Sequence, residues 1–303
     1  MIMTDRLHKF KGVLLHNEPM VKHTSWRSGG IVKQFYTPSD IDDLAAFMLS
    51  LDDEEQIMFI GLGSNLLVRD GGYKGSVISL KGSLSEIQLL EANKVRVGAG
   101  TSCAKLARFC HKNNLVGGEF FAGIPGLVGG ALAMNAGAFG GETWKVVDSV
   151  ITLNRQGVLN RRTAEDYEIS YRSVSGPADE WFVSVDFKFT PGDGEVAAER
   201  VKALLKKRSD TQPTGLPSCG SVFKNPPDDY AARLIEGCGL KGYSVGDATV
   251  SEKHANFIIN TGNATASEIE SVIRYVQKTV REKHGVELQT EVKIVGELAD
   301  ESV

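Results

Sequence analysis

Glycine is concentrated in one segment of the chain strongly enough to restrict what that segment can become. Residues 123–141, GIPGLVGGALAMNAGAFGG, contain seven glycines and no charged side chain. The segment is too apolar for a linker, and its glycine content argues against a helix. Because glycine reaches φ > 0 and lacks a Cβ, successive main-chain N–H groups here can converge on an anion, with dinucleotide pyrophosphate as the first candidate. For one such run alone, a tight structural turn is the simpler explanation.

A second glycine-containing run, Gly61–Leu67 (GLGSNLL), favours anion binding over a purely structural turn. It directly follows Ile57–Ile60, an apolar segment that reads as a buried strand. The run lacks the third glycine and the following helix of the dinucleotide fingerprint, and it lacks the Gly-Lys-Ser/Thr of a P-loop. We therefore expect a loop whose amides and hydroxyls hold a phosphate outside the doubly wound nucleotide folds.

Composition limits the classes of function. The chain has 303 residues, 42% of them hydrophobic, and a net charge of −4, so it is long enough for two domains and has no polycationic surface. We expect neither nucleic acid nor a membrane as a partner, and we expect a monomer. No run of about eighteen or more apolar residues occurs, and residues 1–20 carry charges throughout, which predicts a cytoplasmic location.

The four cysteines, at positions 103, 110, 219 and 238, show no Cys-x-x-Cys spacing and no histidine at metal-ligand spacing. We expect no metal site and reduced, structural thiols. An influence of Cys219 on chemistry at nearby Ser221 stays open, although a small buried residue is the simpler reading.

Periodicity and turn residues predict a mixture of helices and strands. The expected helices are Ser39–Leu51 with a Ser cap, Cys103–His111, Val196–Arg208, one around Ala231–Glu236, and a long one opened by Thr265 and Glu268 at capping-box spacing. The expected strands include Val77–Leu80, Val95–Val97, a hairpin over Ser149–Arg162, Trp181–Phe189, Asn256–Asn260 and a last strand, Val286–Val295.

The turn cluster Pro191–Gly194 is the clearest boundary in the chain. The sequence therefore predicts an α+β protein with an N-terminal helical segment (1–20), a first domain (21–192) and a smaller C-terminal domain (193–303).

Several motifs resemble known flavoproteins. GLGSNLL, VGAG at Val97–Gly100 and the long glycine run are similar to the FAD-binding domain of the vanillyl-alcohol-oxidase (PCMH) type. Four further features, Thr24–Gly30 (TSWRSGG), Ser170–Arg172 (SYR), Gly220–Pro226 (GSVFKNP) and Glu291, resemble the UDP-N-acetylenolpyruvoylglucosamine reductases of peptidoglycan synthesis. The resemblance covers roughly residues 21–297 in chain order.

The resemblance implies non-covalent FAD, NADPH as co-substrate, and reduction of the enolpyruvyl group of a UDP-sugar to UDP-N-acetylmuramate, with residues 21–192 holding FAD and 193–303 holding the substrate. The implied cofactor-binding residues are Gly61, Gly63, Ser64, Asn65, Leu66, Gly100, Thr101, Gly123, Pro125, Gly126, Gly129, Gly130, Asn135, Ala136 and Gly137.

The resemblance also implies three catalytic residues. Arg172 matches the arginine that binds the substrate carboxylate, for which a planar guanidinium is well suited. Ser221 matches the proton donor to carbon, and Glu291 matches a glutamate that orients the substrate or assists protonation. Without the resemblance, these residues read as a solvated arginine, a common Gly-Ser turn and an exposed position of a strand.

The substrate-binding candidates are Lys224 and Asn225 from the motif, then Arg208 and His254, with weaker claims for Arg233 and Lys241. A diphosphate needs cations, although a lone histidine is as often structural. No tyrosine occurs between Arg172 and Ser221, so the chain resembles the shorter subgroup, which lacks a substrate-covering tyrosine loop. Two alternatives stay open: an FAD-linked oxidase of the same fold, and a non-catalytic flavin- or nucleotide-binding protein.

Overall fold

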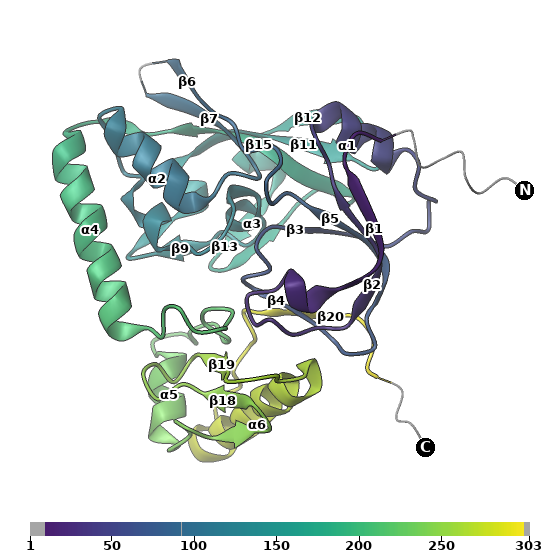
Figure 1. Cartoon of the computed structure of the whole chain (residues 1–303). Coiled ribbons are helices and arrows are strands. Elements are labelled where there is room, and N and C mark those ends of the chain that lie inside the picture. Colours follow the sequence, from purple (N-terminus) through teal and green to yellow (C-terminus); the bar gives the residue numbers. More distant parts are fainter. Residues whose placement is uncertain (1–9, 92, 300–303) are drawn as a thin grey trace, which may run out of the picture. The chain divides into compact units, whose positions relative to one another are not determined.

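A computed structural model describes residues 10–91 and 93–299 (Figure 1). Its contacts divide the chain into two units. The first unit comprises Met1–Leu15, Gln34–Gly61 and Gly75–Lys206, and the second comprises His16–Lys33, Leu62–Lys74 and Lys207–Val303. No helix within the described ranges is both long and apolar enough to cross a membrane.

The first unit is built on an antiparallel five-stranded sheet of order β12-β11-β15-β7-β6. Its strands are β12 (Leu159–Arg162), β11 (Val147–Asn154), β15 (Glu180–Lys188), β7 (Lys94–Gly98) and β6 (Ile87–Glu91). Val150 pairs with Val185, which in turn pairs with Val97, and all three are fully buried. They pack in one hydrophobic core with Leu106 and Val128, from the helices α2 (Cys103–Lys112) and α3 (Val128–Ala133). Burial of these aliphatic and aromatic side chains is the main source of this unit's stability.

Another sheet has the order β1-β2-β5-β3, and the chain passes from one unit to the other within three of its strands. The strands are β1 (Val13–Pro19), β2 (Ile31–Thr37), β5 (Tyr73–Ser79) and β3 (Ile57–Ile60), with α1 (Ile41–Met48) between β2 and β3. Within the first unit β3 pairs in parallel with β5, with Ile60 opposite Ser79. This pairing fixes the point at which the chain leaves the sheet, at Gly61.

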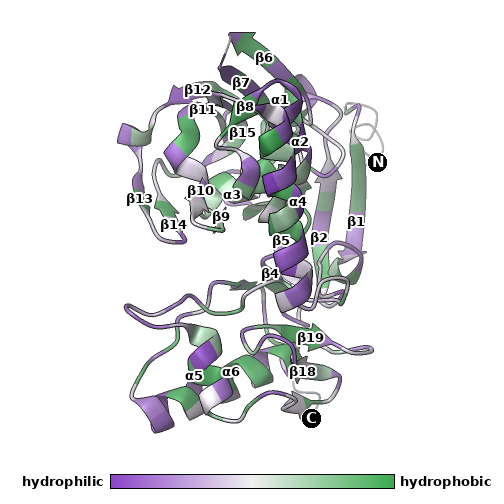
Figure 2. Cartoon of the chain, turned by 90° about the vertical axis from the view of Figure 1, so that its left-hand side faces the viewer, coloured by the Kyte–Doolittle hydropathy of each residue, from purple (hydrophilic) through white to green (hydrophobic). Residues whose placement is uncertain are grey.

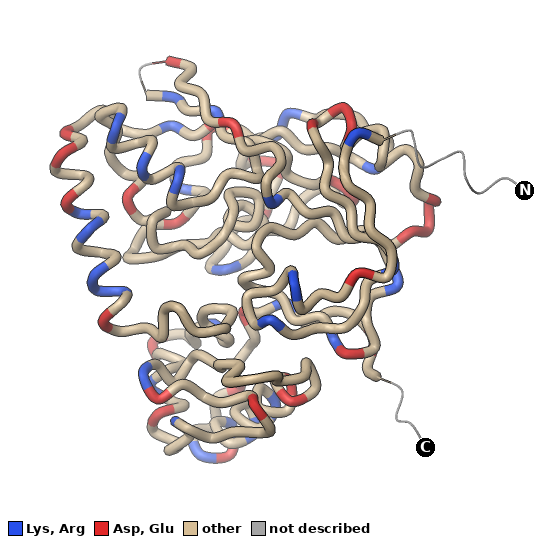
Figure 3. The backbone as a smooth tube through the Cα atoms, viewed as in Figure 1, with Lys and Arg blue, Asp and Glu red and all other residues tan. Residues whose placement is uncertain are grey.

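Short elements complete the first unit. They are β8 (Leu115–Val116), η2 (Glu119–Gly123), β9 (Gly137–Ala138), β10 (Gly141–Glu142), η3 (Thr143–Val146), η4 (Ala164–Asp166), β13 (Glu168–Ser170), β14 (Ser173–Ser175) and β16 (Thr190–Pro191). The helix α4 (Gly194–Thr211) follows, with acidic residues in its first part and basic residues further along (Figure 3). Hydrophobic and hydrophilic residues alternate along α4 (Figure 2), and only Gly194 and Ala197 of it are buried.

The second unit has a three-stranded antiparallel sheet, β17-β18-β19, packed with two helices. Its elements are η1 (Met20–Lys22), β4 (Leu66–Val68), α5 (Ala231–Gly237), β17 (Ser244–Val245), β18 (Ala248–Val250), β19 (Ile258–Asn260), α6 (Ala266–His284) and β20 (Lys293–Val295). β20 pairs in parallel with β4, with Lys293 opposite Leu66. The buried residues Trp26, Leu67, Phe223, Ile258 and Val276 share one core, so segments far apart in sequence form this unit together.

Several predicted elements are confirmed within one or two residues, including the β11–β12 hairpin, α2 and α5. The capping box of α6 is present: Thr265 accepts from the Glu268 N–H, and the Glu268 side chain accepts from the Thr265 N–H. This reciprocal pair satisfies two of the N–H groups that every helix start leaves unbonded.

Other predictions differ from the structure. The helix cap before α1 is Asp40, whose carboxylate accepts from the Asp43 N–H, in place of the expected Ser39. The expected helical segment 1–20 contains the strand β1, while residues 1–9 lie outside the described residues. The last strand is only β20, so Glu291 precedes it. The contact division falls within α4, at Lys206, later than the expected boundary at 192–193.

The prediction that the long glycine run contains no helix is wrong, because α3 lies inside it. Glycine weakens a helix by removing side-chain contacts and raising the entropy of the unfolded chain. Here tertiary packing compensates: Val128, Ala131 and Leu132 are buried, and a Cβ on Gly129 would lie 3.0 Å from the Ala99 Cβ. The small residues let a short helix approach the sheet closely.

Candidate active site

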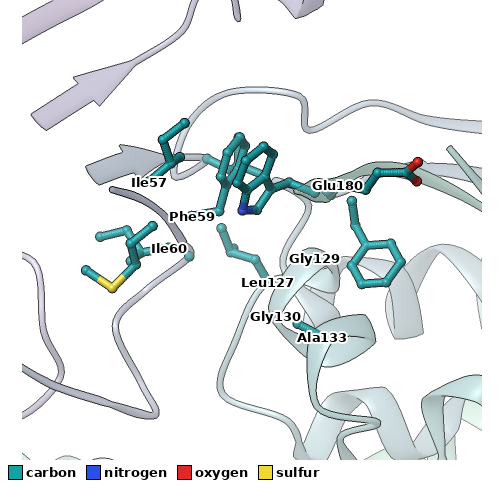
Figure 4. A pocket seen from close by; sticks show the side chains of 14 residues that line it. Ile57, Phe59, Ile60, Leu127, Gly129, Gly130, Ala133 and Glu180 are labelled. Atoms are coloured by element: carbon teal, nitrogen blue, oxygen red, sulfur yellow. The ribbon is translucent and has the colours of Figure 1, made fainter. Parts of the chain in front are cut away.

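A cavity of about 320 Å³ lies in the first unit, at the end of β3 (Figure 4). The rings of Phe59 and Trp181 stack at its wall, with centroids 5.1 Å apart and planes 16° apart. Apart from Glu180, the side chains around it are apolar. The lining residues are Ile57, Met58, Phe59, Ile60, Gly61, Leu80, Ala99, Leu127, Gly129, Gly130, Ala133, Glu180, Trp181 and Phe182. A pocket of this size, apolar and walled by flat rings, suits a planar aromatic group.

Both glycine runs contribute to this cavity. Gly61 lies in its wall, together with Gly129 and Gly130 of α3. A Cβ on Gly61 would lie 3.0 Å from Leu127, whereas a Cβ on Gly130 would meet nothing within 4 Å. A side chain at position 130 would therefore extend into open space, which glycine leaves empty.

The start of α3 is tied to the chain that follows β7. The N–H groups of Val128 and Gly129 donate to the carbonyls of Thr101 and Ala99, each at 2.8 Å. The other predicted cofactor residues of this unit, Gly100, Thr101, Gly123, Pro125, Gly126, Asn135, Ala136 and Gly137, do not line the cavity. Thr101 and Asn135 are buried among protein atoms.

Arg172 lies in the turn between β13 and β14, with φ of 54°. Its Nη2 donates to the Gly137 carbonyl at 2.7 Å, and its Nη1 donates to the Asn135 carbonyl at 3.3 Å. The guanidinium carbon also lies 5.1 Å from the centre of the Tyr171 ring. The side chain is therefore fixed against the glycine run and is not the solvated arginine that the sequence alone suggested.

In the second unit, the loop Gly63–Leu66 is held by backbone contacts. The Gly63 carbonyl accepts from the Ser25 N–H at 3.1 Å and from the Cys219 thiol at 3.4 Å. Gly63 has φ of 60°, and a Cβ there would collide with the His23 carbonyl, so only glycine fits without displacement. Asn65 donates from Nδ2 to the Glu291 carbonyl at 3.0 Å, while its own carbonyl accepts from the Lys293 N–H.

The segments that carry Ser221 and Glu291 run antiparallel to each other. Phe223 bridges Thr290, the Lys224 N–H donates to the Gln289 carbonyl at 2.9 Å, and the Glu291 N–H donates to the Val222 carbonyl at 2.8 Å. Two motifs that are about seventy residues apart in the sequence thus become neighbouring extended segments joined by backbone hydrogen bonds. Both Ser221 and Glu291 are half-buried.

Comparison with known proteins identifies the family. Residues 212–295 match the C-terminal domain of UDP-N-acetylenolpyruvoylglucosamine reductase, and residues 32–161 match an FAD-binding domain. The chain is 55% identical over 287 residues to the UDP-N-acetylenolpyruvoylglucosamine reductase of Methylococcus capsulatus, covering 95% of this chain and 94% of that one. The chain belongs to the UDP-N-acetylenolpyruvoylglucosamine reductase family.

Further matches agree. The reductase of Legionella pneumophila (strain Corby) is 54% identical over 288 residues, covering 95% of this chain and 94% of that one. The crystal structure of the reductase (MurB) from Thermus caldophilus superposes with a TM-score of 0.79 at 30% identity, covering 94% of this chain and 98% of that one. The chain is thus an FAD-dependent reductase of peptidoglycan precursor synthesis, with an FAD-binding domain of the PCMH type and a reductase C-terminal domain. Family membership removes the oxidase and the non-catalytic alternatives.

The substrate-binding candidates of this reductase differ in their surroundings. Asn225 accepts from the Ala231 N–H at 3.1 Å and so holds the start of α5, while Lys224 is half-buried beside it. Arg208 donates to Gln212 at 3.1 Å. Burial lowers the pKa of His254, with a smaller contribution from the charge of Lys241, so the imidazole is neutral near pH 7. A neutral His254 can donate a hydrogen bond, but it adds no charge toward a diphosphate.

The two candidates with weaker claims, Arg233 and Lys241, already have acidic partners. Arg233 pairs with Asp229, and Lys241 pairs with Glu236 at 2.7 Å. Each pair joins one residue of α5 to a residue just outside it, Asp229 before the helix and Lys241 after it.

Sequence reasoning missed Asn256 as a site residue. Its Oδ1 accepts from the Phe223 N–H at 2.9 Å, its Nδ2 donates to the Phe223 carbonyl at 2.8 Å, and its carbonyl accepts from the Val222 N–H. The side chain thereby bonds both backbone polar groups of Phe223, two residues after Ser221. The aromatic wall formed by Phe59 and Trp181 was also missed, because these rings belong to none of the glycine motifs and come together only in the fold.

Proposed function

We propose that Arg172, Ser221 and Glu291 act on the enolpyruvyl group of UDP-N-acetylglucosamine enolpyruvate when this reductase converts it to UDP-N-acetylmuramate. The observation that carries the proposal is the antiparallel pairing that brings the Ser221 and Glu291 segments together. A site that must protonate a carbon atom needs its donor held in a fixed place, and paired backbones provide that.

The first unit fits FAD. Its cavity of about 320 Å³ is apolar, bounded by stacked aromatic rings, and lined by Gly130, where a Cβ would meet nothing within 4 Å. We propose that this cavity receives a planar ring system of FAD. As a separate proposal, the N–H groups and hydroxyl of the Gly63–Leu66 loop bind phosphate. When bound, FAD takes a hydride from NADPH and supplies it to the substrate double bond.

Arg172 stabilises the substrate carboxylate. Hydride addition to an enol ether conjugated with a carboxylate places negative charge on that carboxylate, so a fixed cation lowers the barrier. The guanidinium is held by the Gly137 and Asn135 carbonyls and therefore does not have to reorganise during the reaction. Its permanent charge and its planar fork of donors suit a carboxylate better than a lysine would.

Ser221 donates the proton that completes the reduction, and Glu291 orients the substrate or assists that transfer. A serine hydroxyl is a weak acid, but the carbanion-like species it meets is a strong base. The neighbouring peptide groups are fixed by Asn256 and by the Glu291 N–H, so the hydroxyl is presented by a rigid loop.

We also propose that Lys224, Asn225, Arg208 and His254 contact the substrate, with the charge coming from Lys224 and Arg208. The UDP-sugar and NADPH are the partners that the family implies. That residues 21–192 hold FAD and 193–303 hold the sugar nucleotide is part of the proposal, as are the monomeric state and the cytoplasmic location.

The test is an anaerobic stopped-flow experiment on Ser221→Ala. We expect flavin reduction by NADPH to keep its rate, and flavin reoxidation by the UDP-enolpyruvyl sugar to slow by about 10²- to 10⁴-fold, the range of a lost general acid. Ser271→Ala is the matched control, since Ser271 is an exposed serine whose hydroxyl bonds only within α6. Equal losses in both half-reactions would show that Ser221 is not the proton donor.

A further inference from the structure

We propose that Asn135 is a positioning residue that holds Arg172 in place, and that it does not bind the cofactor directly. The proposal rests on the carboxylate-binding role of Arg172 given above. It revises the role that the family resemblance suggested for Asn135, which was a cofactor contact within the glycine run.

The side chain of Asn135 is occupied by protein at both ends. Its Nδ2 donates to the Ser170 carbonyl at 3.1 Å, and its Oδ1 accepts from the Trp144 N–H at 3.2 Å. The residue is only 3% exposed. A buried amide with both of its polar atoms bonded in this way is committed to the fold, and breaking either bond to reach a ligand would leave a buried partner unbonded.

These bonds act on both the backbone and the side chain of the catalytic arginine. The amide of Asn135 fixes Ser170, two residues before Arg172, while the Asn135 carbonyl accepts from Arg172 Nη1 at 3.3 Å. Gly137 holds Nη2 in the same way at 2.7 Å. The contacts of Asn135 thus hold the β13–β14 turn at Ser170 and hold the guanidinium group of Arg172.

These contacts are needed because of the backbone conformations of Arg172 and Asn135. Arg172 has φ of 54° and Asn135 has φ of 45°, both in the left-handed region. Asparagine adopts that region more readily than most residues, whereas arginine adopts it at a cost of about 1–2 kcal/mol. An isolated turn would relax toward another conformation, so the surrounding bonds must maintain the direction in which Arg172 points.

Asn135 is in turn bonded, directly and through Trp144, to the end of α3. Trp144 is buried, and its indole Nε1 donates to the Leu132 carbonyl at 2.9 Å, at the end of α3. The Asn135 N–H donates to the same Leu132 carbonyl. Asn135 therefore connects the catalytic arginine to a rigid part of the core rather than to a loose loop.

The experiment is a double-mutant cycle of Asn135→Ala with Arg172→Ala, measured on FAD-loaded protein. Four readouts are taken: the dissociation constant of FAD, the rate of flavin reduction by NADPH, the dissociation constant of the UDP-enolpyruvyl sugar, and the rate of reoxidation by that sugar. For Asn135→Ala we expect the first two to change less than about threefold and reoxidation to slow by about 10- to 100-fold, as for a misplaced catalytic group.

The cycle separates the possible outcomes. In the Arg172→Ala background, Asn135→Ala should cause no further loss of reoxidation rate, because there is no longer an arginine to position. The same fractional loss in both backgrounds, or a weaker affinity for FAD that accounts for the loss, would overturn the inference. If Arg172→Ala itself leaves reoxidation unchanged, the proposed role of Arg172 fails instead.

Two further variants serve as a control and as a replacement for Asn135→Ala. Asn113→Ala is the control, since Asn113 also donates a side-chain hydrogen bond to a carbonyl, that of Phe109, but at the exposed end of α2. If Asn135→Ala does not fold, Asn135→Ser replaces it, because serine keeps a short polar side chain at the buried position. Equal loss for Asn135→Ser with and without Arg172 would contradict the proposal in the same way.

Discussion

Gly130 offers a way to fill the cavity of the first unit without disturbing the fold. A Cβ at this position meets nothing within 4 Å, and Gly130 lies inside α3, where residues have helical backbone angles. Alanine and leucine are both better helix formers than glycine. Gly130→Ala should therefore be tolerated with the cavity largely open, whereas Gly130→Leu should extend a branched side chain into a space of about 320 Å³.

We expect both substitutions of Gly130 to stabilise the fold, and Gly130→Leu also to weaken FAD binding. Removing glycine from a helix interior stabilises by about 0.8–1.0 kcal/mol for alanine, and nearly as much for leucine. In a domain of 150–250 residues this raises the melting temperature by about 2–4 °C. Gly130→Leu should at the same time weaken FAD binding by at least about tenfold, or 1.4 kcal/mol, because it competes with the ligand for the cavity.

The assay is thermal unfolding of apoprotein with and without added FAD, together with a titration of FAD by flavin fluorescence. Wild type and Gly130→Ala should both gain stability with FAD, about 2.7 kcal/mol at a concentration one hundred times the dissociation constant. Gly130→Leu should melt at least as high as wild type without FAD and gain far less with it. If Gly130→Leu binds FAD as tightly as Gly130→Ala does, the cavity is not part of the cofactor site.

Two other predictions concern burial. Hydrogen bonds from Arg69 lower the pKa of buried Glu270 from its ordinary value of 4.5, so its stabilising effect should be complete above that pH and should be lost as pH falls through the lowered value. Glu270→Gln should cost about 2 kcal/mol at pH 7 and progressively less in acid; a pH-independent loss in urea unfolding would contradict this. Burial also raises the pKa of the Cys103, Cys110 and Cys219 thiols to about 12, so a thiol reagent at pH 8 should label them only in denaturant, and rapid labelling of the native protein would refute it.

Local signals in the sequence predicted several elements of the fold correctly. The capping box at Thr265, the alternation in β15 and the turn between β11 and β12 are each decided by residues within a few positions, and the structure has all three. The last strand was predicted too long because the alternation of Leu288, Thr290 and Val292 looks the same in a strand and in an extended segment. Only β20 finds a regular partner, β4, and that partner lies more than two hundred residues earlier.

The site was predictable to the extent that its motifs are contiguous. The motifs named Arg172, Ser221 and Glu291, but nothing in them indicates that Asn135 and Asn256 bond to the segments that carry Arg172 and Ser221, because these bonds join residues 35 and 33 positions apart. An asparagine in a glycine run is typical of phosphate contacts, and the same amide can instead complete buried peptide groups. Which use applies is decided by burial and by the partner atoms. At Asn135 both polar atoms of the side chain bond to the backbone, so this residue, which the resemblance implied as a cofactor contact, fits the proposed role of positioning Arg172.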